Sequence, residues 1–274
     1  MTIPENIRKS EKQYLDTLEK FFLINWGNTN LYSHDLSHHR RVWKYAKELL
    51  LSVNNHSEIE ENFTDKLIIA CYLHDIGMSV DPGARHGRMS RDICEQFLIK
   101  NTLPVNEFSD TLAAVENHDN KEYRDKSGNN LLLTFLSAAD DLDAFGYTGI
   151  YRYSEIYLMR GINPSEIGYL IQANASGRFD NFSTIFGDDD ELRRKHNYRY
   201  EILSRFFSDY NVQAAMYDFG NNKPEGICGI IDIFCGLVKS GDDPEALFIS
   251  FSEGSDDPVI SSFFRELRHE LSCW

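Results

Sequence analysis

Histidines are concentrated in one stretch of the chain. Seven of the nine histidines lie between residues 34 and 118, and a cluster of aspartates follows at 140–143. Imidazole nitrogens and carboxylate oxygens are the usual protein ligands of divalent transition metals. A metal site is therefore the first chemistry that the sequence predicts.

Three segments set these residue types beside apolar, core-forming residues. His74 and Asp75 follow the apolar run 67–73, His38 begins another helical pattern, and Asp140 lies within a third. An ionised aspartate beside a core-forming run is costly to bury unless it is paired. One shared metal ion accounts for the burial of all three segments.

Three short motifs occur in a fixed order along these segments. They read His38-x-x-Arg41-Val42, Leu73-His74-Asp75-Ile76-Gly77 and Ala139-Asp140-x-Leu142-Asp143-Ala144-x-Gly146. In this order they resemble the motifs of the HD-domain superfamily of metal-dependent phosphohydrolases, over about residues 25 to 155. The resemblance implies an all-α bundle that holds a divalent ion through His38, His74, Asp75 and Asp140.

Two more histidines fall between the His-Asp pair and the last aspartate. Some branches of the superfamily use two histidines in this interval to bind a second ion, and the resemblance assigns that role to His86 and His118. The alternative is that both are polar residues at the edge of the cleft, or that they bind phosphate. The Gly-Tyr-Pro signature of cyclic-dinucleotide cleavage is absent. Met78-Ser79 stands where alarmone hydrolases carry Glu-Asp.

The resemblance also implies a mechanism. A bound ion polarises a phosphoryl oxygen and supplies hydroxide near neutral pH, with His74 and Asp75 at the catalytic centre. Arginine forks suit phosphate oxygens, so Arg85, Arg88 and Arg41 are the candidate substrate contacts, with a structural role as the alternative for Arg41. Ligands rich in imidazole favour one or two ions of Mn, Fe, Co, Ni or Zn rather than Mg.

Composition limits the partners. The net charge is −15, which disfavours duplex nucleic acid as a partner but allows a small phosphorylated substrate at a metal centre. No apolar run reaches the length of a membrane span, and the N-terminus lacks a secretory signal, so we expect no membrane partner. Five cysteines without a CxxC pair indicate free thiols in a reducing cytoplasm.

Apolar residues recur with helical spacing along nearly the whole chain, which predicts an all-α protein. We expect an HD-domain core over 1–155 and a helical C-terminal extension over 156–274, packed against that core. A homodimer is compatible with this extension. In the second half the predicted helices cover 165–172, 191–207, 227–237, 244–251 and 259–271, and one predicted break covers 174–182.

Side chains outside the ligand set receive simpler interpretations. Asp141 is expected to face solvent, and His196 to lie on the surface. His39 is expected beside the ligands or exposed. Asp143 is expected to orient a ligand histidine or a basic side chain, or else to cap a helix.

The leading functional prediction is a phosphomono- or phosphodiesterase that acts on a nucleotide or another small phosphorylated molecule. The alternative is a non-catalytic metal- or nucleotide-binding sensor or interaction module that retains the HD core. A nuclease acting on single strands is disfavoured by the negative charge and by the lack of a stripe of basic and aromatic residues. A metal-dependent oxygenase on a related fold would use similar ligands.

Overall fold

The computed structural model describes residues 2–53, 59–119, 130–221 and 223–272. All regular elements in these ranges are α- or 3₁₀-helices, and they include no strand, which confirms the all-α prediction. The chain forms two compact units: Met1–Thr29 with His34–Asp140, and Asn30–Ser33 with Asp141–Trp274. The expected division into 1–155 and 156–274 and the packing between them stay predictions.

The first unit is built around one buried helix. Its helices are α1 (Ile3–Trp26), α2 (Leu36–Ser52), α3 (Phe63–Leu73), α4 (His86–Lys100), α5 (Ser109–Asn117) and most of α7 (Leu131–Asp143). Every residue of α3 except Asp65 is buried, and the helix packs on α1, α2, α4 and α5. The apolar run that precedes the His-Asp pair therefore forms the centre of this unit.

A glycine allows the next element to approach α4. After α3 the chain turns through the 3₁₀-helix η3 (Ile76–Ser79), where the Gly77 amide donates a hydrogen bond to Ser90 Oγ at 2.8 Å. A Cβ atom on Gly77 would lie 2.3 Å from the carbonyl oxygen of His86 and 2.4 Å from the amide nitrogen of Ser90. Because both are backbone atoms, no side-chain movement relieves the clash.

Replacing Gly77 with alanine should therefore displace the start of α4 and destabilise the protein by about 1–3 kcal/mol or more. Chemical denaturation measures the free energy of unfolding. Gly177→Ala is the matched control, because a Cβ at this helical position meets no atom within 4 Å and should stabilise by about 0.5–1 kcal/mol. Equal stability of the two variants would contradict the proposed close approach.

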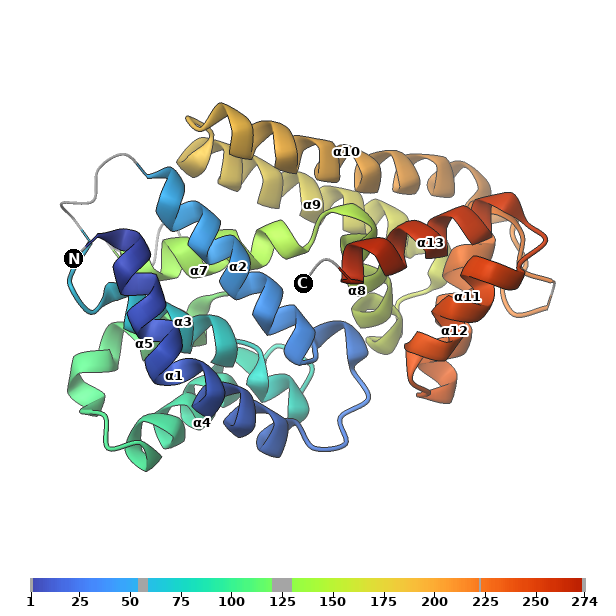
Figure 1. Cartoon of the computed structure of the whole chain (residues 1–274). Helices are drawn as coiled ribbons and strands as arrows, with labels where there is room; N and C mark the ends of the chain where they lie inside the picture. Colours follow the sequence, from blue (N-terminus) through green and yellow to red (C-terminus); the bar gives the residue numbers. More distant parts are fainter. Residues whose placement is uncertain (1, 54–58, 120–129, 222, 273–274) are drawn as a thin grey trace. The chain divides into compact units, whose positions relative to one another are not determined.

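The second unit contains two long helices and a group of shorter ones. They are α8 (Gly146–Met159), α9 (Pro164–Phe186), α10 (Asp190–Gln213), α11 (Gly226–Ser240), α12 (Pro244–Gly254) and α13 (Pro258–Ser272). Figure 1 shows α9 and α10 side by side as a helical hairpin, and these helices pack on each other. Helix α8 packs on α10, α11 and α13.

The break predicted over 174–182 is wrong, because α9 continues through it. The polar residues that suggested a loop have partners inside the unit. Asn174 Oδ1 accepts hydrogen bonds from Tyr153 OH at 2.9 Å and from Arg178 Nε at 3.0 Å. The contact with Tyr153 joins α9 to α8, and the contact with Arg178 lies within α9.

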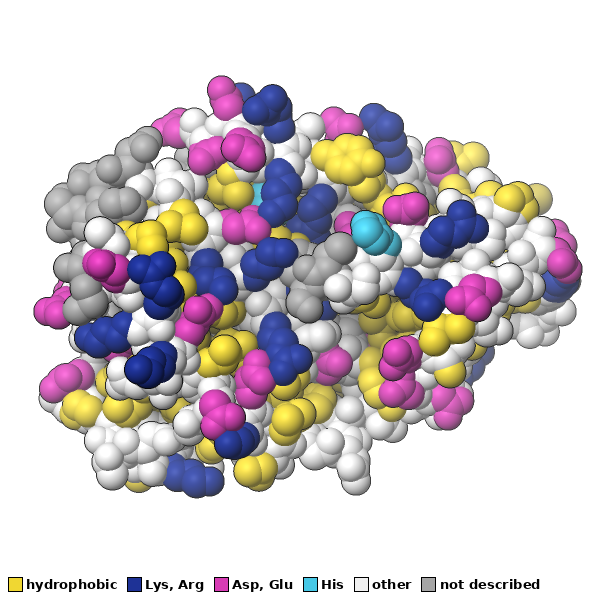
Figure 2. Space-filling view, in the orientation of Figure 1, with side chains coloured by type: hydrophobic (Ala, Val, Ile, Leu, Met, Phe, Trp, Pro, Cys, Tyr) yellow, Lys and Arg dark blue, Asp and Glu magenta, His cyan; other side chains and the backbone are white. Residues whose placement is uncertain are grey.

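Charges of both signs are interspersed on the face shown in Figure 2. Several exposed pairs are ion pairs, such as Lys20 with Asp16 and Arg85 with Asp81. Among the described residues, no helix combines the length and apolar character needed to cross a bilayer.

Candidate metal centre

Four side chains from three helical segments of the first unit meet in its interior. His38 lies in the first turn of α2, which Asp35 caps by accepting a hydrogen bond from the Ser37 amide at 2.8 Å. His74 and Asp75 follow α3, and Asp140 lies near the end of α7. All four ligand-type residues are buried, with at most 7% of the residue exposed.

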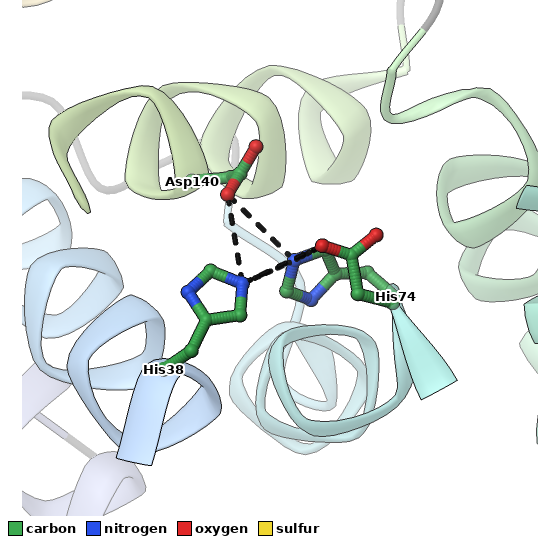
Figure 3. Close-up of side chains that lie close together, drawn as sticks. His38, His74 and Asp140 are labelled. Carbon is green, nitrogen blue, oxygen red and sulfur yellow. Dashed lines mark hydrogen bonds and ion pairs between the residues drawn. The ribbon is translucent and has the colours of Figure 1, made fainter. Parts of the chain in front are cut away.

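Their ligand atoms are close enough to share one ion. The Nε2 atoms of His38 and His74 are 3.2 Å apart, and Asp75 Oδ2 lies 3.5 and 3.4 Å from them. Asp140 Oδ1 lies 3.7 and 3.8 Å from the same two nitrogens, and Figure 3 shows its carboxylate directed toward both rings. Ligands about 2.1 Å from one ion are themselves separated by roughly 3.0–3.4 Å. Shifts of a few tenths of an ångström would therefore complete the coordination.

Asp75 also belongs to a second group of ligand atoms. Its other oxygen, Oδ1, lies 2.9 Å from His118 Nε2 and 3.5 Å from His86 Nε2. Both histidines are buried. The Asp75 carboxylate thus stands between two sets of ligands, with one oxygen directed to each.

The backbone sets the protonation of three of these rings. The Nδ1 atoms of His74, His86 and His118 each lie 2.7–3.0 Å from the carbonyl oxygen of the residue three positions earlier. A carbonyl only accepts hydrogen bonds, so each Nδ1 carries a proton and each neutral ring presents a lone pair on Nε2. Fixing a ligand histidine through its other nitrogen is the usual arrangement in metal sites.

These lone pairs require a cation. The Nε2 atom of His118 faces a carboxylate oxygen, the Nε2 atom of His74 faces another imidazole nitrogen, and buried His86 Nε2 has no hydrogen-bond partner. Two acceptors in contact repel each other unless a proton or a metal cation lies between them. The donor set therefore fits divalent ions.

The pKa values of His74, His118 and Asp75 in the protein without metal also indicate a site for positive charge. Burial alone would lower the pKa of His74, but the carboxylates of Asp75 and Asp140 raise it to about 10. Burial alone would also lower the pKa of His118, but the Asp75 carboxylate raises it above its usual value. Although burial alone would raise the pKa of Asp75, His74 and His118 hold it well below its usual range. The Asp75 carboxylate therefore stays ionised in the interior.

A further histidine supports the ring of His74. His39 was expected either beside the ligands or exposed, and the structure buries it beside them. Its ring centroid lies 5.0 Å from that of His74. Its Nδ1 donates to the Cys71 carbonyl at 3.0 Å, the same oxygen that accepts from His74 Nδ1. Burial keeps the pKa of His39 well below its usual value, so the ring is neutral.

The three arginines predicted to contact substrate occupy different environments. Arg85 and Arg88 are exposed on either side of His86, and Arg85 Nε donates to Asp81 Oδ2 at 2.7 Å. Arg41 is buried and donates to Ser37 Oγ at 3.0 Å, one helical turn earlier. Their roles toward a substrate stay predictions.

Sequence reasoning overlooked or misplaced several polar residues. Asp119, with a side chain 42% exposed, has its Oδ2 4.0 Å from His86 Nε2, and its position directly after His118 is the signal that could have found it. The solvent placement of Asp141 is wrong, because this residue is buried and pairs with Arg178. The surface placement of His196 is also wrong: its buried ring packs on Phe182. Asp143 meets a basic side chain, Arg152, which was one of its predicted roles.

The geometry agrees with the comparison to known protein families. Searches of the curated proteins and of the solved structures found no match to the chain. The family model of the HD domain matches residues 35–144, which include all six of the clustered histidines and aspartates. Over these residues the chain is similar to the HD domain, which is consistent with the HD-domain superfamily.

Proposed function

We propose that the chain is a metal-dependent phosphohydrolase that cleaves a phosphate ester of a nucleotide or of another small phosphorylated molecule. The observation that carries the proposal is the Asp75 carboxylate, buried and ionised between two groups of imidazole nitrogens. Two-metal centres are common in enzymes that hydrolyse phosphate esters, and these residues would hold such a centre.

The ligand assignment follows from the two groups. His38, His74, Asp75 and Asp140 would hold the first ion, and Asp75, His86 and His118 the second. Such ions supply a hydroxide nucleophile near neutral pH and polarise a phosphoryl oxygen. The imidazole-rich set favours Mn, Fe, Co, Ni or Zn rather than Mg.

The residues of the chain prepare this centre in three ways. The backbone carbonyls hold the rings of His74, His86 and His118 with Nε2 directed inward. Burial excludes water from the ligand atoms, which strengthens their electrostatic interactions. With two divalent ions bound, four positive charges would exceed the three negative charges of Asp75, Asp140 and nearby Asp119, so the centre would be locally positive in a protein of net charge −15 and would attract phosphate.

Substrate contacts are assigned from position. Arg85 precedes α4 and Arg88 lies in its first turn, on either side of His86; both side chains are exposed, and Arg85 is paired through Nε with Asp81. We assign to Arg41, which is buried against Ser37, the role of holding the first turn of α2.

Four described cysteines are free and buried, which supports the predicted cytoplasmic location, whereas Cys273 lies outside the described residues. A homodimer stays a prediction.

The test is turnover by protein loaded separately with Mn, Fe, Co, Ni or Zn. Nucleoside mono-, di- and triphosphates, a dinucleotide and a chromogenic phosphodiester are offered, and the products are separated by chromatography. We expect hydrolysis of at least one phosphate ester with at least one metal, and its loss in His74→Ala. Nucleotide binding without turnover under every condition would favour the sensor alternative and overturn the proposal.

A further inference from the structure

The last three residues of α7, from Asp141 to Asp143, belong to the second unit, and three arginines of that unit contact them. Two of these arginines pair with the aspartates that follow the metal-ligand candidate Asp140. Arg178 of α9 lies 2.7 Å from Asp141, and Arg152 of α8 lies 3.2 Å from Asp143. Both aspartate side chains are at least nine-tenths buried, and both arginine side chains are at most 15% exposed.

The third arginine binds backbone. Arg199 of α10 donates to the carbonyl oxygen of Leu142 at 2.7 Å and to that of Phe145 at 2.8 Å. Carbonyl groups at a helix C-terminus lack partners within the helix and carry partial negative charge, so a cation there is favourable. Glu270 of α13 lies 3.8 Å from Arg199 and also accepts a hydrogen bond from the Thr148 amide, which ties the same junction to α13.

The clustering of these contacts has a simple geometric consequence. Residues 141, 142 and 143 are each held by a different helix, and Asp140 immediately precedes them in the same continuous helix. A helix end fixed at three successive positions can neither rotate nor fray. The last turn therefore stays helical, which holds the backbone of Asp140 in its helical conformation, and metal sites tolerate misplacements of only about 0.5 Å.

We propose that Arg152, Arg178 and Arg199, together the arginine clamp, are positioning residues that set the affinity of the first metal position through Asp140. This inference rests on the proposed function, because it assumes that the two ligand groups bind metal.

The clamp should act on one metal position only. Asp140 belongs to the group with His38, His74 and Asp75, whereas the group of Asp75, His86 and His118 contains no residue of α7. A loss of general stability would weaken both positions. Selective weakening of one is therefore the signature of positioning.

The experiment is a calorimetric titration of metal-stripped protein with Mn²⁺, supported by elemental analysis after dialysis. Arg178→Gln and Arg199→Gln remove clamp contacts, Asp141→Asn does so with little change of volume, and Arg178→Lys retains the charge. Arg268→Gln is the control, because Arg268 donates to Ser252 Oγ at 2.7 Å elsewhere in the second unit. Circular dichroism and the thermal midpoint identify the variants that fold.

We expect wild type and Arg268→Gln to bind two ions. The folded clamp variants should bind one of the two about 10- to 100-fold more weakly and the other within about twofold of wild type, with partial recovery in Arg178→Lys. Equal affinities in wild type and Asp141→Asn, or equal weakening of both ions, would overturn the inference and leave the proposed function intact. A wild-type protein that binds no ion would overturn both.

Discussion

Asp75→Asn should lose both metal ions and nearly all activity. The amide keeps the shape of the side chain but removes the negative charge of Asp75, the one residue that belongs to both ligand groups. We expect turnover of any substrate found to fall at least about 10³-fold, since the metal-activated nucleophile is lost. Elemental analysis and a rate assay on the same preparation measure the two effects together.

Asp110→Asn is the matched control for this variant. Asp110 also lies in the first unit and pairs with Lys66 at 2.9 Å, but neither residue belongs to a ligand group. This variant should keep its metal and its rate. If Asp75→Asn retained one tightly bound ion, the shared role of its carboxylate would be refuted.

Metal binding should raise the thermal midpoint strongly. At a free concentration about 1,000 times the Kd, an ion that binds only the folded state stabilises it by about 4 kcal/mol. For a chain of this size each kcal/mol raises the midpoint by roughly 2–4 °C, so metal-stripped protein should gain about 10 °C on loading. Scanning fluorimetry measures the gain, which should vanish in Asp75→Asn.

The gain should grow with pH. Without metal, the pKa of His74 is raised from 6.5 to about 10, so its proton stabilises the folded state fully below pH 6.5, and this contribution is lost as pH rises to 10. The metal-bound ring carries no proton on Nε2, so the stability of the metal-bound protein does not fall with pH for this reason. Between pH 6.5 and 9 the gain should therefore rise by at least about 1.4 kcal/mol per unit, because metal at His118 displaces another proton whose pKa is raised. A gain that shrank over this range would show that His74 is not a ligand.

The clustering of the candidate ligands could be predicted from the sequence, because some of them end or begin core-forming helices and the order of the motifs links them to the others. His74 and Asp75 end an apolar run that has to be buried, and His38 follows a helix cap. A buried histidine or aspartate needs a partner, and the order of the motifs indicates which residues share it. The structure brings these residues together with Asp140, His86 and His118.

The partners of other buried charges could not be predicted, because they come from distant segments. Nothing around Asp141 indicates that Arg178 lies 2.7 Å away, so an aspartate beside another aspartate was assigned to solvent. Helix α8 escaped prediction for a related reason. Its glycines and tyrosines are weak helix formers, and packing against α10, α11 and α13 stabilises it instead.

Metal content tests the central claim most directly. Protein purified without chelator is analysed for transition metals beside His86→Ala/His118→Ala, which removes two ligands of the second group only. The two-ion centre predicts close to two ions per chain in wild type and close to one in the double variant. No ion in wild type, even after addition of Mn, Ni or Zn, or an unchanged content in the double variant, would contradict it.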